Sequence, residues 1–161
     1  MCAHDENGAM GLVINHTMPG VDLGQLLLQL NIDISEDIKA CEKTPVMSGG
    51  PVESARGFVL HSDDFTQDDT IEIGNGLSVT GTIDALKAIA NGDGPQQMLF
   101  ILGYAGWSAG QLDEEIRQNA WLITESDHGL IFESPADEVW TRAIGKLGID
   151  PAMLSSNAGS A

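Results

Sequence analysis

The chain has 161 residues, with 24 Asp and Glu against seven Lys and Arg. Its formal charge of −17 opposes binding to nucleic acids and to anionic membranes, because both attract proteins through lysine and arginine. The basic residues are scattered and form no stripe, so we expect no direct nucleic-acid partner and no membrane partner. The length favours one domain over residues 1–161, and 42% hydrophobic residues are typical of a globular protein.

The cysteines, the first residues and the longest apolar run indicate where in the cell the protein is found. Cys2 and Cys41 form no CxxC motif, so no disulfide framework is indicated and a reducing cytoplasm is expected. The first residues are polar and acidic, unlike a signal peptide. The longest apolar run, Met98 to Leu102, is far shorter than a membrane-spanning helix. The sequence therefore predicts a soluble cytoplasmic protein.

The first half of the chain predicts strands around one helix. Ala9–Asn15 has the apolar character of a strand. Asp22 can cap a helix that runs to Leu30, because apolar residues follow it at helical spacing. Gly57–His61 predicts a second strand, and residues 63–69 predict an acidic loop.

The next segment predicts a hairpin, a helix and a buried strand. Thr70–Ile73 and Leu77–Thr80 alternate with period two around a Gly-Asn-Gly turn. Thr82 can cap the helix that follows. Met98–Tyr104 is a continuous apolar run, typical of a strand buried on both faces.

The last third of the chain predicts a helix through Leu112 and Ile116 and a short strand over residues 129–132. A final helix is expected to begin with Ser134 as its N-cap residue and to bury Trp140 on its apolar side. Residues 155–161 contain no core residues and are predicted to fray. Strands and helices alternate, but hairpins interrupt them. This pattern favours a single compact α/β domain, with a mixed sheet of parallel and antiparallel strands flanked by about four helices.

A strand, a glycine-rich turn and a helix start meet at Gly106-x-Ser108-x-Gly110, which has the spacing of a hydrolase nucleophile elbow. As a nucleophile, Ser108 would need a downstream histidine, and His128 is the only one that follows it. Alternatively, Ser108 and Gln111 form a capping box, in which the serine hydroxyl accepts the Gln111 backbone N–H. Because capping explains the same residues without a catalytic partner, the sequence favours a non-enzyme.

Gly110 allows two further interpretations. A glycine in the first turn of a helix can let an anion approach the backbone N–H groups. It can also let the turn pack closely against Gly49-Gly50, where Pro51 follows and breaks any regular element. We prefer close packing, because the acidic residues 113–115 disfavour an anion there.

No metal ion and no cofactor are predicted. His4-Asp5-Glu6 and His61-Ser62-Asp63-Asp64 lack a recognised ligand spacing, such as two histidines four residues apart on a helix. The acidic loop after Asp63 lacks the central glycine of a calcium-binding loop. No glycine-rich phosphate-binding motif joins a strand to a helix.

Four stretches, taken in order, carry a family resemblance. They are Cys2–Asn15 (CAHDENGAMGLVIN), Gly49-Gly50-Pro51-Val52 with Arg56-Gly57-Phe58, Gly103–Ile116 (GYAGWSAGQLDEEI) with Asn119-Ala120-Trp121, and Ala158–Ala161 (AGSA). Together they resemble the AlgH/YqgE-like family of bacterial proteins. The resemblance implies a compact α/β domain of unknown biochemistry. Because some members are described as regulators of alginate genes, it also implies indirect regulation through another protein.

The chain departs from the family pattern at both ends. The family usually has a further apolar strand upstream, which is absent here, and often has a histidine where this chain has Ser160. Without the upstream strand, we expect Ala9–Asn15 to lie at an open edge of the sheet. An open edge recruits partners, so the chain is expected to form a homodimer or to cover the edge with residues 155–161.

The favoured hypothesis is a non-catalytic domain that binds a small molecule or a protein. The alternatives are a small serine hydrolase using Ser108 and an indirect transcriptional regulator. The candidate binding cleft lies where the glycine turn meets the signature segment, and comprises Asn15, Gly49, Gly50, Pro51, Arg56, Gly103, Tyr104, Trp107, Gly110 and Gln111.

Overall fold

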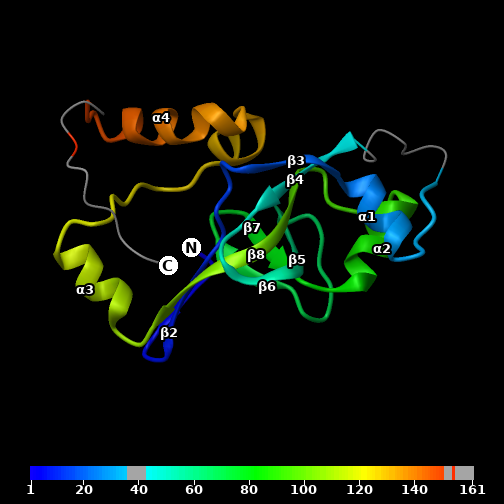
Figure 1. Cartoon of the computed structure of the whole chain (residues 1–161), viewed down its shortest axis with the longest axis horizontal. Helices are drawn as coiled ribbons and strands as arrows, with labels where there is room; N and C mark the ends of the chain where they lie inside the picture. Colours follow the sequence, from blue (N-terminus) through cyan, green and yellow to red (C-terminus); the bar gives the residue numbers. More distant parts are fainter. Residues whose placement is uncertain (36–42, 151–153, 155–161) are drawn as a thin grey trace.

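The computed structural model describes residues 1–35, 43–150 and 154. Its strands are β1 (Ala3–Asp5), β2 (Gly8–Gly11), β3 (Thr17–Asp22), β4 (Pro45–Ser48), β5 (Val52–Ser62), β6 (Ile71–Gly74), β7 (Leu77–Thr80) and β8 (Met98–Ser108). Its helices are α1 (Leu23–Gln29), α2 (Ile83–Asn91), α3 (Gln111–Arg117), the single π-helical turn η2 (Gly129–Glu133) and α4 (Ala136–Lys146). The described residues therefore form an α/β domain with five helical segments, where the sequence predicted about four (Figure 1).

The sheet is built around β8, which pairs with β2, β4 and β5. The strands follow the order β1-β2-β8-β5-β7-β6, while β4 joins β3 to β8. β4 runs parallel to β8, with Val46 opposite Phe100, and the other described pairings are antiparallel. The sheet is thus mostly antiparallel. It curls so far that residues of its two end strands, β1 and β6, line one cavity.

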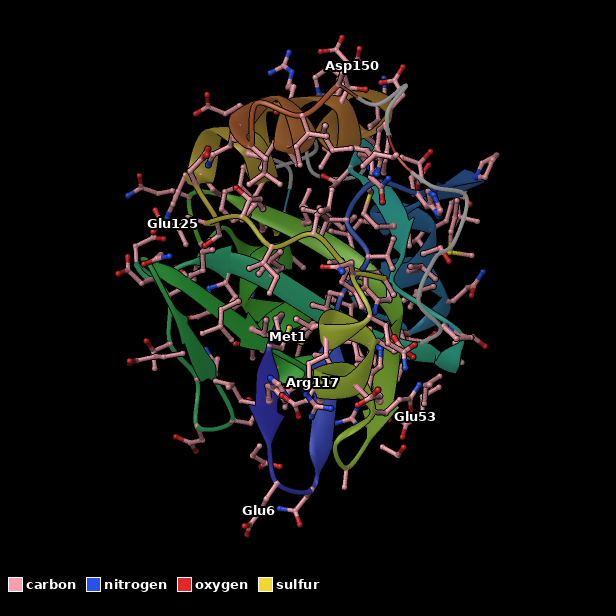
Figure 2. The ribbon with its side chains drawn as sticks, turned by 90° about the vertical axis from the view of Figure 1, so that its left-hand side faces the viewer. Met1, Glu6, Glu53, Arg117, Glu125 and Asp150 are labelled. Carbon is pink, nitrogen blue, oxygen red and sulfur yellow. The ribbon has the colours of Figure 1, made fainter. Side chains whose placement is uncertain are left out.

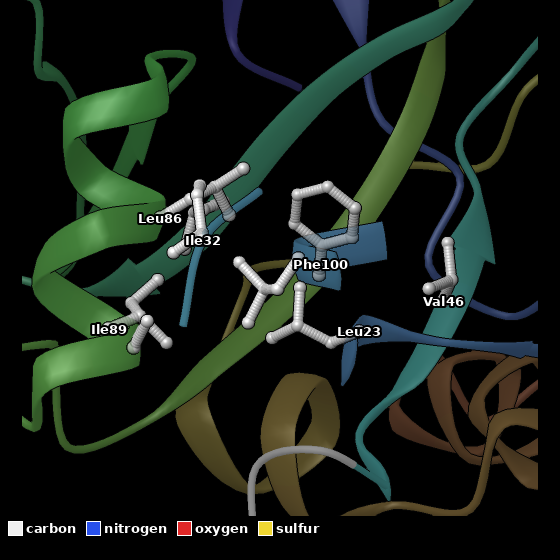
Figure 3. Packing of buried hydrophobic residues seen from close by; sticks show 9 residues of the cluster. Leu23, Ile32, Val46, Leu86, Ile89 and Phe100 are labelled. Carbon is white, nitrogen blue, oxygen red and sulfur yellow. The ribbon is translucent and has the colours of Figure 1, made fainter. Parts of the chain in front are cut away.

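Helices α1 and α2 cover one face of the sheet. Their apolar residues form a cluster with side chains from β4, β5 and β8 (Figure 3). Its buried members are Leu23, Leu27, Ile32, Val46, Val59, Leu86, Ile89, Ala90 and Phe100. Because a buried leucine or isoleucine stabilises a fold by roughly 1.5–3 kcal/mol, this cluster holds the helices in place.

The opposite face of the sheet carries a second cluster, which surrounds Phe58 and Ile101 and includes Ile131 of η2. A third, smaller cluster lies between α3 and the ends of β2 and β8, with Trp107 and Leu112 at its centre. In Figure 1, α3 and α4 lie away from the α1–α2 pair. The helices thus cover separate parts of the curled sheet.

Gly103 changes which face the side chains of β8 reach. Before it, Leu99 and Ile101 pack in the second cluster while Phe100 packs in the first, as strand alternation requires. Gly103 has φ 73°, a left-handed conformation that favours glycine. Strict alternation would point Tyr104 toward the first cluster, like Phe100. Because Gly103 turns the backbone, Tyr104 packs against the second cluster instead.

Several predicted element boundaries are confirmed. The Asp22 carboxylate accepts the Gln25 N–H at 2.8 Å, and the Thr82 hydroxyl accepts the Ala85 N–H at 3.4 Å, so both caps form. The hairpin is present as β6 and β7. These features depend on neighbouring residues, which is why the sequence reveals them.

Predictions for the segment after α3 were wrong in three details. Residues 129–132 form the π-helical turn η2 instead of a strand, because the Asp127 carboxylate accepts the Leu130 N–H at 2.7 Å and starts a helical turn. Pro135, not Ser134, is the N-cap residue of α4. Trp140 is 50% exposed, while Val139 takes the buried position.

The predicted open edge at Ala9–Asn15 was also wrong. β2 pairs with β1 on one side and with β8 on the other, so both of its edges are occupied by strands of this chain. Residues 155–161, predicted to fray or cover that edge, lie outside the described residues. Among the described residues, no helix is long and apolar enough to cross a membrane.

Candidate functional site

A cavity of about 580 Å³ opens between β1 and β6, and we call it the β1–β6 groove. Cys2 and Asp5 lie on its β1 side, and Asp69 and Ile71 on its β6 side. Its other walls come from β2, β5, β7 and β8. Figure 2 shows the β1–β2 hairpin in blue, with Met1 at its start and Glu6 at its turn, beside the green strands of the β6–β7 hairpin. The groove therefore lies at the seam of the curled sheet.

Two aromatic rings, Phe58 and Tyr104, form the floor of the groove, and the Arg56 side chain lies over one of them. The rings of Phe58 and Tyr104 meet edge to face, with centroids 6.0 Å apart and planes at 84°. The Arg56 guanidinium carbon lies 5.1 Å from the centroid of the Phe58 ring, and Nη1 donates to Oε2 of Glu53 at 3.0 Å. Such stacking holds a guanidinium over an apolar surface while leaving part of it in water.

Acidic groups flank this floor. The Asp5 carboxylate accepts the Asn7 N–H at 2.7 Å. The Asp69 carboxylate accepts the Gly81 N–H at 3.4 Å and the Thr82 hydroxyl at 3.3 Å. Both aspartates are exposed, so their charges face solvent at the rim of the groove. Burial raises the pKa of the Cys2 thiol, so this side chain is neutral at pH 7.

The signature segment joins α3 to the end of β8 through Glu115. The indole N–H groups of Trp107 and Trp121 both donate to Glu115 Oε2, at 3.2 and 2.6 Å, and Gln111 Nε2 donates to Oε1 at 3.0 Å. The two indoles pack edge to face, 5.6 Å apart. The Gln111 oxygen accepts the Ser108 N–H at 3.0 Å and the Ser108 hydroxyl at 3.1 Å. These side chains hold the helix against the strand.

The capping prediction for Ser108 is half right. Gln111 reaches back to the Ser108 N–H as expected, but Ser108 is the last residue of β8 and Gly110, with φ 72°, is the N-cap residue of α3. His128 bonds Gln97 Oε1 at 2.9 Å and the Asn75 carbonyl at 3.2 Å. These partners lie by the opposite end of β8, so the structure does not bring His128 to Ser108.

The predicted convergence of two glycine segments involves Gly103 instead of Gly110. A Cβ on Gly49 would lie 2.3 Å from the Gly103 oxygen, and one on Gly50 would lie 2.2 Å from the Tyr104 carbonyl carbon. A Cβ on Gly110 would have no neighbour within 4 Å. The Gly49-Gly50 turn thus packs against the β8 backbone, while Gly110 serves a turn that needs positive φ.

The structure unites some of the ten predicted site residues and separates others. Arg56, Tyr104 and Trp107 line the β1–β6 groove. Those that do not line it are Asn15, Gly49, Gly50, Pro51, Gly103, Gly110 and Gln111. Phe58 and Asp69 also line the groove but were not among the predicted site residues. Phe58 belongs to a stretch that carries the family resemblance, and Asp69 belongs to the predicted acidic loop. Among the residues that the structure describes, no group of three or more His, Cys, Asp or Glu could hold a metal ion.

Comparisons with known proteins relate the whole chain to one family. A family model described as AlgH-like matches residues 1–152. A UPF0301 protein of Beijerinckia indica is 52% identical over all of this chain and 81% of its own length. One of Rhodospirillum rubrum is 45% identical over all of this chain and 82% of its own length.

Two solved structures share the fold. The solution structure of AlgH from Pseudomonas aeruginosa is 42% identical, with a TM-score of 0.76, covering 98% of this chain and 82% of that one. A crystal structure from Corynebacterium diphtheriae is 16% identical with a TM-score of 0.67, covering 89% of this chain and 73% of that one, and shows the fold alone. The curled sheet, the signature segment and these matches together show that the chain belongs to the AlgH-like family.

Proposed function

We propose that this chain is a non-catalytic binding protein whose ligand enters the β1–β6 groove. The observation that carries the proposal is the cavity of about 580 Å³, which lies within the size range of ligand sites. Its floor is apolar and aromatic, and its polar residues include Arg56, Asp5 and Asp69, which can orient a ligand.

The roles of the signature residues support binding over catalysis. Gln111 and Glu115 are engaged in hydrogen bonds that hold α3, and Ser108 is bonded to Gln111. An indirect regulatory role would use the same groove to bind another protein. We also propose a cytoplasmic location, because Cys2 is a free thiol and the sequence has no CxxC motif.

Blocking the groove tests the proposal. Ala3 is exposed and lines the groove, so Ala3→Trp should fill part of the cavity without disturbing the core. Leu28→Trp is the matched control, because Leu28 is 67% exposed on α1 and does not line the groove. A library of small fragments would be screened by ligand-observed NMR against the three proteins.

We expect some fragments to bind the unaltered chain and the Leu28→Trp control but to lose binding to Ala3→Trp. The absence of any binding fragment, or equal binding to all three proteins, would overturn the proposal.

A further inference from the structure

A second cavity, of about 430 Å³, lies between α1, α2 and the sheet, and we call it the α1–α2 cavity. Leu86 and Phe100, which belong to the buried first cluster, form part of its inner wall (Figure 3). Leu30 and Ile83 stand at its rim, where they are 45% and 55% exposed. Its described walls come from the two helices and from β5, β7 and β8, whereas Met1 lines another cavity beside the second cluster.

The surface around this cavity carries little charge. None of the described residues that line it is ionisable. α1 has no charged residue, and the two charged residues of α2, Asp84 and Lys87, form an ion pair at 2.8 Å. The whole chain, in contrast, has 24 acidic and seven basic residues. This helix pair is thus a nearly neutral, apolar surface on a strongly acidic protein, and such surfaces are typical of the core of a homodimer interface.

The shape of this surface suits a second copy of the same chain. Across a two-fold axis both copies present the same patch, so the patch must contain a projection as well as a recess. Leu30 and Ile83 provide the projections, and the cavity beside them provides the recess. An apolar side chain at the rim of one copy can therefore enter the cavity of the other.

The position of the two helices limits the repulsion between two acidic copies. In Figure 1, α1 and α2 lie at one end of the long axis and α3 lies toward the other. Contact through the α1–α2 end places the acidic remainder of the two copies on opposite sides of the interface. Exposed charges more than ~8 Å apart are largely screened at physiological salt. Most of the net charge of −17 on each copy is then distant from the contact.

We propose that the chain forms a two-fold symmetric homodimer through the α1–α2 cavity, with Leu30 and Ile83 of each copy packed into the cavity of the other. Removal of these apolar side chains from water supplies the driving force. The inference does not involve the β1–β6 groove, so it extends beyond the proposed ligand binding and its test is independent of that proposal.

One substitution at the rim tests the contact. Ile83→Glu places a charge at the first position of α2, where an acidic residue suits the helix N-terminus and should not disturb the fold. The matched control is Ile71→Glu, which makes the same change at an isoleucine of similar exposure, 53%, outside the cavity. Sedimentation velocity over a dilution series measures the dimer. We expect Ile83→Glu to weaken dimerisation at least tenfold and Ile71→Glu to change it less than twofold.

Two further measurements identify the surface and its chemistry. Amide chemical shifts that change on dilution should be confined to the end of α1, the start of α2 and the strand residues that line the cavity. Raising the salt concentration from ~0.1 to ~1 M shortens the screening length from about 10 to about 3 Å. Because the contact is apolar and the net charges of the two copies repel each other, the dimer should become at least threefold tighter at high salt.

A chain that stays monomeric at ~1 mM would overturn the inference. Equal effects of the two glutamate substitutions, or dilution shifts centred on β1 and β6, would place the contact elsewhere and overturn it as well. Association that weakens at high salt would contradict an apolar contact. Binding of a small apolar fragment to the cavity of a purely monomeric chain would assign the cavity to a ligand instead of a second copy.

Discussion

Gly103 is the residue on which the geometry of β8 depends. Its φ is 73°, and a Cβ there would lie 2.6 Å from the Gly50 oxygen. A side chain at this position would therefore meet both backbone strain and a clash with a rigid neighbour. The same residue turns Tyr104 toward the groove, so the fold and the proposed site depend on it together.

Alanine substitutions at three glycines should separate these effects. Gly103→Ala should destabilise the fold by ~2 kcal/mol or more, from strain and clash combined. Gly110→Ala should cost ~1 kcal/mol, since its φ is 72° but the space around it is open. Gly106→Ala should have the smallest effect, because its nearest contact would be 3.4 Å away. Urea unfolding measures all three, and the reverse order would contradict this explanation.

His61 lies in a chain of hydrogen bonds with Ser62, Thr80 and Thr70. Its ring is fully buried, and Nδ1 lies 2.8 Å from the Ser62 carbonyl, so Nδ1 must donate. Nε2 lies 2.9 Å from the Thr80 hydroxyl oxygen, with which it shares a hydrogen bond. The Thr80 and Thr70 hydroxyl groups share a further hydrogen bond at 2.7 Å. Both nitrogens of the buried ring therefore have a hydrogen-bond partner.

Replacing Thr80 with valine keeps the shape of the side chain but removes the centre of this chain. Thr80→Val should destabilise the protein by ~1–3 kcal/mol, because His61 Nε2 loses its hydrogen-bond partner in a buried position. Thr17→Val, at an exposed position of β3, serves as the control and should change stability by less than ~0.5 kcal/mol. Equal effects of the two substitutions on the free energy of unfolding would argue against the hydrogen-bond chain.

At the scale of elements, Asp127 joins η2 to α4. Its carboxylate accepts the Leu130 N–H at 2.7 Å and forms an ion pair with Lys146. The hydrogen bond from Lys146, followed by that from the Leu130 N–H, lowers the pKa of Asp127 below its usual value. A lowered folded-state pKa contributes stability above the unfolded value, and this contribution is lost as the pH falls through the folded value.

Asp127→Asn should therefore lower the thermal midpoint at pH 7, where the carboxylate is ionised. Since asparagine keeps an oxygen for the Leu130 N–H, the difference reports mainly on the Lys146 pair. Once the pH has fallen through the lowered folded-state pKa of Asp127, both proteins lack the charge, and their midpoints should converge. A difference that stays constant from pH 7 to the acid range would contradict this assignment. Calorimetric scans across that range provide the measurement.

At the scale of the whole molecule, the few basic residues are engaged locally. Five of them form ion pairs with nearby acids, namely Arg56, Lys87, Arg117, Arg142 and Lys146. All five pairs are at least partly exposed, so each contributes little to stability. Each of these positive charges is neutralised by its own acidic partner. The remaining acidic residues give the chain its net charge of −17.

The chain should accordingly show no direct affinity for nucleic acid. We expect a labelled DNA duplex at ~150 mM salt to bind more weakly than ~100 µM, because few phosphates can be neutralised. Fluorescence anisotropy measures this directly. Micromolar binding that weakens as salt is raised would show that a basic surface had been overlooked.

Features that depend on neighbouring residues were predictable from the sequence. The caps at Asp22 and Thr82, the β6–β7 hairpin and the apolar core of β8 follow from side-chain type and short-range spacing. The family resemblance was visible in four short motifs and is confirmed by the comparisons. Each of these signals lies within a few residues along the chain.

The proposed site becomes visible only in the tertiary structure. The opposite sides of the β1–β6 groove are β1, at residues 3–5, and β6, at residues 71–74, and no local pattern indicates that they meet. Likewise, β1 covers the edge of β2 that the sequence left open, and Val139 replaces Trp140 in the core. The physical reason is that pairing and burial depend on which distant surfaces come into contact. Propensity and periodicity do not contain that information.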